Sequence, residues 1–378
     1  MRFLIFSAST GGGHKRAAAA LEEKFRAVNP ESTVYVVDGL RSIGKVYDKT
    51  VCKGYYIMAT KTPKVYGKFY KITDKNNTMY KAVMKSNAMM SEKLLETIEQ
   101  YNPDVLIACH PFISAMVGKL KRQGKIQIKT ISLITDYDSH RTYISPYIDA
   151  YVVAEPQMAK KLHEEYGVDE TKVYPLGIPT FDKFNKKVKR DEICRREGLD
   201  PGKTTVLLMA GSFGVTGVMH FYEQLAKEGN NLQLIVITGK NEKLYEKLKK
   251  HIAELGTGDF TKLLYFVDNV EDYMHVSDLI VTKPGGLTVT ESLACGLPMA
   301  IYSAFPGQEL ENVKFLISQN AAIFIDKDLG AQQIISLLNA PRALEEMKEN
   351  CHRLAHPQAA RDIYDLAMEL TGNNVKGN

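Results

Sequence analysis

Short apolar segments recur along the whole chain, and the stretches between them have helical patterns. Most of these segments are rich in Val, Ile and Leu, and eleven are candidate strands: residues 2–7, 33–38, 104–109, 129–135, 149–153, 204–210, 232–238, 263–267, 278–282, 298–302 and 321–325. Continuous apolar runs are typical of parallel strands that helices cover on both faces. The alternation of strands and helices therefore predicts a doubly wound α/β fold.

The length of the chain indicates more than one domain. Its 378 residues exceed what one hydrophobic core usually supports, so we expect two doubly wound, Rossmann-like parallel sheets that face a central cleft. A charged, Lys-rich stretch after Gly177-Ile-Pro-Thr180 has the composition of a linker. We therefore expect an N-terminal domain at residues 1–180, a linker at 181–200 and a second domain at 201–340. Residues 341–378 would form a C-terminal helix, from about 341 to 370, and a tail, and would pack back across the hinge.

One segment has the pattern of a nucleotide-binding turn. Residues 282–292 end a predicted strand, turn on Gly285 and Gly286, and open a helix. The two glycines let the backbone approach a ligand, and the unpaired amides of the first helical turn favour an anion. Thr288 adds a hydroxyl, and Glu291 is placed to accept from both hydroxyls of a ribose. The pattern predicts a nucleoside diphosphate site, and the alternative is an ordinary turn with a buried capping glutamate.

A second glycine turn follows the first predicted strand. Ser9-Thr-Gly-Gly-Gly-His14 leads into an Ala-rich helix start, and it matches neither the dinucleotide fingerprint nor a P-loop. His14 would lie at a helix N-terminus, which disfavours the cationic imidazole. A neutral imidazole can act as a general base, so His14 is a candidate catalytic residue; the alternative is a helix cap or a surface residue.

Composition restricts the class of protein. The apolar fraction of 44% and the charged fraction of 25% are those of a soluble globular protein. No apolar run approaches the roughly 20 residues of a membrane span, and the N-terminal run is too short for a signal peptide, so we expect a cytoplasmic protein. The five cysteines are scattered without a C-x-x-C pair, which indicates reduced thiols and neither a disulfide framework nor a zinc site.

Charge is distributed unequally along the chain. Residues 1–150 contain 23 Lys and Arg against 13 Asp and Glu, a net charge of +10, and the remaining 228 residues carry −5. Between Arg41 and Lys85, eleven basic residues meet only two acidic ones and alternate with aromatic residues. Helical spacing of lysines beside apolar residues suits an anionic membrane surface. The alternative is a pair of solvated helices packed on the sheet, and the standard nucleic-acid motifs are missing.

An ordered set of motifs extends over nearly the whole chain. It comprises Ser9-Thr-Gly-Gly-Gly-His14, His110-Pro111, Thr135-Asp136, Gly177-Ile-Pro179, Met209-Ala-Gly-Ser-Phe-Gly214, Thr238-Gly-Lys-Asn241, Thr282-Lys-Pro-Gly-Gly286, Glu291, and Pro306-Gly-Gln-Glu309 with Asn312. With this set the chain resembles the monogalactosyldiacylglycerol synthase and processive diacylglycerol glucosyltransferase family. Members of that family share the two-Rossmann GT-B glycosyltransferase fold with the bacterial enzyme that makes lipid II.

The resemblance implies that the C-terminal domain holds a UDP-hexose. Glu291 would bind the ribose, the turn Gly211-Ser-Phe-Gly214 would cover the phosphates and the sugar, and Val267 would face the uracil. Gln308 and Glu309 would bind hydroxyls of the sugar. The implied UDP-sugar residues are Gly211, Ser212, Phe213, Gly214, Lys240, Val267, Gly285, Gly286, Thr288, Glu291, Gln308, Glu309 and Asn312.

The resemblance also implies the reaction and the acceptor. Glucose or galactose would pass in one inverting displacement to the free hydroxyl of 1,2-diacylglycerol, forming a β-linked glycolipid, with one sugar or several added. His14 would be the base, and Asp136 would orient it or serve as base itself. The protein would bind peripherally to the cytoplasmic face of the cell membrane. The implied acceptor and membrane residues are Gly12, Gly13, His110, Lys45, Lys49, Tyr55, Lys64, Lys68 and Phe69.

No metal or other cofactor is expected for this chemistry, because backbone amides and a helix N-terminus can stabilise the departing diphosphate. Asp136-Tyr-Asp138 imitates a manganese-binding pair, but it lies far in sequence from the diphosphate turn. Three alternatives remain: a UDP-sugar epimerase, a lipid II-type N-acetylglucosaminyltransferase, and a non-catalytic UDP-sugar sensor. A nucleic-acid partner is not expected.

Overall fold

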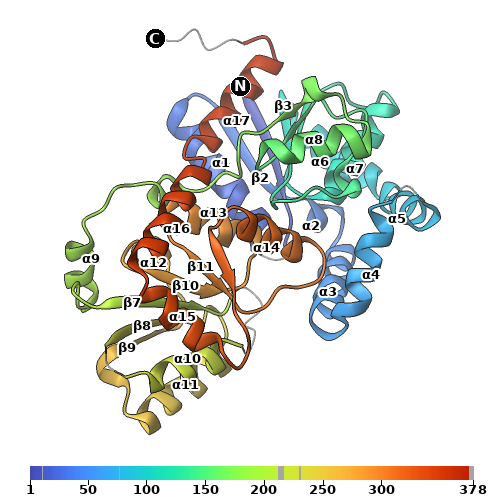
Figure 1. Cartoon of the computed structure of the whole chain (residues 1–378). Helices are drawn as coiled ribbons and strands as arrows, with labels where there is room; N and C mark the ends of the chain where they lie inside the picture. The colour runs from blue at the N-terminus through green and yellow to red at the C-terminus, as the bar shows by residue number, and fades with distance from the viewer. Residues whose placement is uncertain (11, 76, 212–216, 230, 374–378) are drawn as a thin grey trace. The chain divides into compact units, whose positions relative to one another are not determined.

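Two compact units make up the chain in the computed structural model, which describes residues 1–10, 12–75, 77–211, 217–229 and 231–373 (Figure 1). The N-terminal unit comprises Met1–Phe181, the short segment Phe305–Glu311 and the chain from His356 onward. The C-terminal unit comprises Asp182–Ala304 and Asn312–Ala355. Each unit is built around its own parallel sheet.

The N-terminal unit contains a six-stranded parallel sheet with the strand order β2-β1-β3-β4-β5-β6. Its strands are β1 (Arg2–Ser7), β2 (Thr33–Asp38), β3 (Val105–Ala108), β4 (Lys129–Leu133), β5 (Ala150–Val152) and β6 (Val173–Tyr174). Its helices are α1 (Gly13–Val28), α2 (Gly39–Ile43), α3 (Lys45–Lys61), α4 (Pro63–Thr73), α5 (Thr78–Ala88), α6 (Ser91–Tyr101), α7 (Pro111–Arg122), α8 (Pro156–Tyr166) and α17 (Ala359–Leu370).

The C-terminal unit has a second six-stranded parallel sheet, with the order β12-β11-β10-β7-β8-β9. Its strands are β7 (Thr204–Met209), β8 (Leu232–Ile237), β9 (Thr261–Leu264), β10 (Leu279–Thr282), β11 (Met299–Ile301) and β12 (Ala322–Phe324). The helices are α9 (Arg190–Glu197), α10 (Gly217–Lys227), α11 (Glu242–Leu255), α12 (Val270–His275), α13 (Gly286–Ala294), α14 (Gln308–Ser318), whose first turn belongs to the N-terminal unit, α15 (Gly330–Leu338) and α16 (Pro341–Leu354).

The strands are apolar because both faces of each sheet are covered. Phe3, Leu4, Ile5 and Phe6 of β1 are fully buried, and the central strand β10 is buried along its whole length. The sequence-based prediction of two doubly wound parallel sheets is therefore confirmed, and a strand lies within or overlaps each of the eleven predicted segments. Among the strands that the structure describes, only β6 was not predicted, because its two residues are too short for a recognisable apolar run.

The prediction of a single C-terminal helix from 341 to 370 is wrong. The structure has two helices, α16 and α17, because Pro357 lies between them and disfavours helical geometry at the residue before it. Helix α17 packs on α1 in the N-terminal unit, where the ring of Tyr364 lies 5.2 Å from that of Phe25 and 5.7 Å from that of Phe3. Helix α16 packs on α13 in the C-terminal unit.

Candidate active site

Three neighbouring strands of the N-terminal sheet end at one group of polar side chains. His14 lies in the first turn of α1 after β1, His110 caps α7 after β3, and Thr135 and Asp136 follow β4. Because β1, β3 and β4 are adjacent and parallel, their carboxyl ends meet at one edge, where doubly wound folds bind ligands. His14 is 121 positions from Thr135 in the sequence, and the sheet order brings the two residues together.

Contacts from β3 and β4 hold the imidazole of His14. Its Nδ1 lies 3.0 Å from the hydroxyl oxygen of Thr135, and its ring centroid lies 5.0 Å from that of His110. Burial lowers the pKa of His14 to about 4, although a hydrogen bond to the Cys109 carbonyl opposes this shift. Burial, with the neighbouring His14, also lowers the pKa of His110. Both rings are therefore neutral at pH 7, so His14 is in the form that can accept a proton.

The charge of Asp136, which is half-buried, acts on four tyrosines. Burial is the main reason that the pKa values of these phenols are raised, and the negative charge of Asp136 adds to the rise at each of them: Tyr55, Tyr66, Tyr70 and Tyr143. Thr135 hydrogen-bonds Tyr143 as well as His14. The second candidate base therefore lies among neutral hydroxyl groups, beside the residue that positions the first.

Asp138, two residues after Asp136, is paired with a lysine. Lys161 donates to Asp138 over 2.7 Å, and the charges of Asp138 and Asp136 both add to the rise that burial causes in the pKa of Tyr70. Burial raises the pKa of Asp138, and the ammonium of Lys161 opposes this rise. Within the described ranges, no group of three or more His, Cys, Asp or Glu side chains is arranged to hold a metal ion.

The second candidate site lies at the start of α13 in the C-terminal unit. No side chain caps this helix, and a Cβ added to Gly285 would meet no atom within 4 Å, so there is open space beside the turn. Thr288 lies half-buried in the first turn, and Glu291, one turn further, is only 2% exposed. The Asn312 amide is buried and donates to the Pro284 carbonyl over 2.8 Å, so Asn312 supports the turn from behind.

The remaining donor-site predictions lie after β7, β8 and β9. Gly211 has a positive φ of +68°, the backbone conformation that favours glycine, whereas the predicted residues Ser212, Phe213 and Gly214 lie outside the described part of the chain. The Lys240 ammonium lies 4.8 Å from the ring centroid of Phe266, beside the half-buried Val267. These residues follow the carboxyl ends of neighbouring strands, as the nucleotide-binding residues of such sheets do.

Gln308 and Glu309 belong to the segment Phe305–Glu311 of the N-terminal unit. The Gln308 amide donates to the Tyr55 hydroxyl over 2.9 Å and accepts from the Tyr66 hydroxyl over 2.8 Å. The Glu309 carboxylate accepts from the Phe305 amide over 2.7 Å and closes the turn. Gln308 is therefore in contact with helices α3 and α4, and Glu309 closes the turn that carries it.

Helices α3 and α4 expose both lysines and apolar side chains. Of the residues predicted to contact the acceptor or the membrane, Lys45, Lys49, Lys64 and Lys68 are exposed, and Tyr55 and Phe69 are half-buried. The exposed apolar residues Val46, Ile57, Val65 and Ile72 share these helices with the lysines, and we call these four apolar residues with Lys45, Lys49, Lys64 and Lys68 the basic-apolar surface. None of the described helices combines the length and apolar character of a membrane span.

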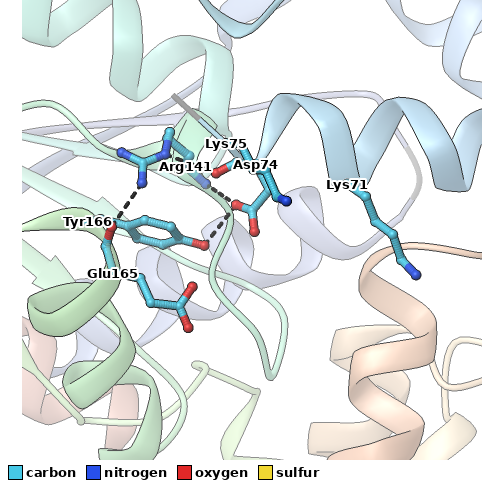
Figure 2. Close-up of a pocket in the computed structure, with 6 residues that line it drawn as sticks. All are labelled: Lys71, Asp74, Lys75, Arg141, Glu165 and Tyr166. Atoms are coloured by element: carbon cyan, nitrogen blue, oxygen red, sulfur yellow. Dashed lines mark hydrogen bonds between the residues drawn. The ribbon is translucent and has the colours of Figure 1, made fainter. Parts of the chain in front are cut away.

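A cavity of about 420 Å³ lies at the end of α4 and is lined by Lys71, Asp74, Lys75, Arg141, Glu165 and Tyr166 (Figure 2). Asp74 accepts from the Tyr166 hydroxyl over 2.8 Å and from the Arg141 amide over 2.9 Å. The Arg141 side chain donates to the Asp74 carbonyl and to the Glu165 carbonyl. These groups bind one another, so the cluster fixes the end of α4 to α8.

Sequence reasoning missed the side chains that position the others. Thr135, Tyr66 and Tyr143 were not among the predicted site residues, yet they contact His14, Gln308 or Thr135. Tyr66 had a signal, since it lies in the basic and aromatic stretch, but its partner is 242 positions away. Lys283, within the turn predicted to bind a diphosphate, is only 6% exposed, which is unusual for a lysine.

Two family models match the chain. Residues 14–180 match monogalactosyldiacylglycerol (MGDG) synthase, and residues 205–365 match the glycosyltransferase family 28 C-terminal domain. The processive diacylglycerol beta-glucosyltransferase of Bacillus subtilis (strain 168) is 31% identical over 92% of this chain and 90% of its own length. The protein of the same name from Staphylococcus epidermidis (strain ATCC 12228) is 28% identical over 99% and 94%.

Solved structures resemble the fold at low sequence identity. MnaA of S. aureus, determined with UDP, has a TM-score of 0.67 at 13% identity and covers 100% of this chain and 99% of its own. MurG of Acinetobacter baumannii has a TM-score of 0.61 at 15% identity and covers 97% and 99%. These likenesses confirm the two-domain glycosyltransferase fold, and the family models and curated relatives confirm the resemblance found in the sequence.

Proposed function

Because the chain belongs to the processive diacylglycerol beta-glucosyltransferase family, we propose that it transfers glucose from UDP-glucose to the free hydroxyl of 1,2-diacylglycerol. The product is a β-linked glycolipid, to which further sugars can be added. The relationship over more than nine-tenths of the chain carries this proposal, because it covers both candidate sites. The names of the relatives favour glucose over galactose as the donor hexose.

The acceptor hydroxyl loses its proton to a base in the N-terminal unit. Two groups are candidates, the neutral imidazole of His14 and the carboxylate of Asp136. His14 is supported by its position after β1 and by the contact with Thr135, which orients the ring. Asp136 is supported by its place next to Thr135 and by the surrounding tyrosine hydroxyls. The alcohol then attacks the anomeric carbon from the side opposite UDP, and the configuration inverts.

The departing UDP gains negative charge, and the first turn of α13 stabilises it. No side chain caps the amides of this turn, and the positive end of the helix dipole lies at the same place, so both favour binding of an anion. Glu291 binds the ribose, and Thr288 adds a hydroxyl to the diphosphate site. We propose that this stabilisation replaces a metal ion, so that turnover continues in a chelator.

The acceptor lies in a membrane, and the basic-apolar surface is the proposed contact with it. Each lysine near an anionic surface adds about 1 kcal/mol of binding free energy, and exposed apolar side chains add burial in the headgroup region. The excess of positive charge in residues 1–150 also favours binding to an anionic membrane. We therefore propose peripheral attachment to the cytoplasmic face of the cell membrane, with no nucleic-acid partner.

A UDP-release assay tests the proposed function. Purified protein is mixed with EDTA, anionic vesicles with or without diacylglycerol, and UDP-glucose or UDP-galactose in parallel. We expect UDP release that requires diacylglycerol and prefers UDP-glucose, together with a glycolipid product. Release of UDP that is independent of lipid would favour an epimerase, and binding of UDP-glucose without turnover would favour a sensor.

Variants separate the roles of the two candidate bases. If His14 is the base, we expect His14→Ala to reduce kcat about 100-fold or more; if Asp136 is the base, we expect this of Asp136→Asn. The variant that removes only an orienting group should reduce kcat less. His163→Ala in α8 is the matched control, because it removes an imidazole of the same unit whose ring bonds the Val168 carbonyl and lies 3.7 Å from the Glu170 carboxylate. Full activity of both site variants would contradict the proposed acceptor site.

A further inference from the structure

Two tyrosines of the membrane-facing helices hold the amide of Gln308. Tyr55 lies in α3 and Tyr66 in α4, and the Gln308 side chain lies between their hydroxyl groups, at 2.9 and 2.8 Å. The two rings also contact each other edge to face, with centroids 5.7 Å apart. One amide is thus bound through both its nitrogen and its oxygen, which fixes the orientation of the side chain.

The backbone next to Gln308 packs closely against α4. Gly307 has a φ of +107°, and a Cβ there would lie 3.1 Å from the ring of Tyr70 and 3.2 Å from the ring of Tyr66. In α4, a Cβ on Gly67 would lie 2.6 Å from the Cβ of Pro306. Two glycines, one on each side of the contact, are therefore needed for this close packing.

The electrostatic setting keeps both tyrosine hydroxyls neutral. Burial raises the pKa of Tyr55 and of Tyr66, and the negative charges of Asp136 and Glu309 add to this rise, while the hydrogen bond to Gln308 opposes it. Both groups therefore keep their protons at physiological pH. The charge of Asp136, one of the two candidate bases, therefore acts on both tyrosines of the pair.

We propose that Tyr55 and Tyr66 are positioning residues for the donor hexose. They hold Gln308, and through the turn closed by Glu309 they hold the segment Phe305–Glu311 against the acceptor-side helices. This assignment rests on the proposed function, in which Gln308 and Glu309 bind the hydroxyls of the hexose. It also explains why Tyr55, which the sequence assigned to the membrane surface, directs its hydroxyl at Gln308.

Kinetics of Tyr55→Phe and Tyr66→Phe test the assignment, since these changes remove only the hydroxyls and keep the packed rings. We expect each to raise the KM for UDP-glucose roughly fivefold to tenfold, the effect of one lost hydrogen bond on binding. We expect kcat to stay within about twofold, because ground state and transition state lose the contact equally. The KM for diacylglycerol and the binding to anionic vesicles should not change.

Tyr47→Phe is the matched control. Tyr47 lies in the same helix α3, and its hydroxyl donates to the Asn87 side chain over 2.9 Å, so the change removes a hydrogen bond between α3 and α5 without touching Gln308. We expect this variant to behave as wild type. If Tyr47→Phe raised the KM for UDP-glucose as much as Tyr55→Phe and Tyr66→Phe do, the assignment would be overturned. Unchanged KM values in Tyr55→Phe and Tyr66→Phe would also overturn it.

Amide hydrogen exchange of residues 305–311, measured without substrate, separates this assignment from the proposed function. We expect faster exchange in Tyr55→Phe and Tyr66→Phe than in wild type or Tyr47→Phe. If wild type releases no UDP with diacylglycerol, the proposed function fails, and the exchange rates still decide whether the tyrosines hold the segment. If wild type is active and the exchange rates are equal in all four proteins, only the assignment fails.

Discussion

The sequence and the structure both indicate a neutral His14 imidazole, but for different physical reasons. The position at the start of α1 predicts a neutral imidazole because a helix N-terminus disfavours positive charge. In the structure the larger cause is burial among β3, β4 and His110, which lowers the pKa to about 4. The sequence indicates the helix, but desolvation depends on neighbours from distant parts of the chain.

This pKa predicts how stability depends on pH. The folded chain disfavours the cationic imidazole, so as pH falls below 6.5 the unfolded chain takes up a proton that folded His14 accepts only near pH 4. Stability should therefore fall between pH 6.5 and 4, with roughly 2 to 3 kcal/mol due to His14. Urea unfolding of wild type and His14→Gln at pH 7 and 4.5 measures this, and an equal loss in both would contradict the prediction.

At the scale of elements, α3 and α4 each have two roles. Outward they carry the basic-apolar surface, and toward the segment Phe305–Glu311 they present Tyr55, Tyr66 and Gly67. Helix α3 has only one buried residue, Ala59, among its described positions, so packing on the sheet does not explain its apolar side chains. Helical periodicity identifies such faces, but it does not say what each face contacts.

Gly67→Ala tests the contact made by α4. Alanine favours an exposed helix by about 1 kcal/mol over glycine, but here its Cβ would lie 2.6 Å from Pro306 and displace the segment. We expect the KM for UDP-glucose to rise roughly tenfold, as for loss of one to two kcal/mol of binding. Gly54→Ala in α3 is the control, because a Cβ there meets nothing within 4 Å. Equal kinetics of the two variants would contradict the contact.

At the scale of the whole molecule, the distribution of charge favours binding to an anionic surface. The N-terminal 150 residues carry a net charge of +10 while the chain as a whole carries +5, so the excess lies on the unit proposed to receive the lipid. Long-range attraction of this kind raises the local concentration of protein at an anionic surface and weakens with salt.

Replacing lysines at the basic-apolar surface should therefore weaken membrane binding. We expect Lys45, Lys49, Lys64 and Lys68 changed together to Gln to reduce binding to anionic vesicles at least tenfold, since each lysine contributes about 1 kcal/mol. Vesicle co-sedimentation at low and high salt measures this effect. The control changes four exposed lysines of α11 to Gln, Lys243, Lys247, Lys249 and Lys250, with the same change in net charge. Equal binding by both variants would contradict the proposed surface.

The sequence by itself determined the two parallel sheets, the family, and the glycine turns after β1 and β10, because apolar runs, turn glycines and motif order are local properties. Only the tertiary structure decided that α17 packs on α1 in the N-terminal unit, that Asn312 supports the Pro284 turn, and that Tyr55 and Tyr66 hold Gln308. These contacts join residues that lie between 28 and 339 positions apart in the chain, and no local pattern specifies such pairs. They arise when strand order and helix packing bring distant surfaces together, and burial then sets their hydrogen bonds and pKa values.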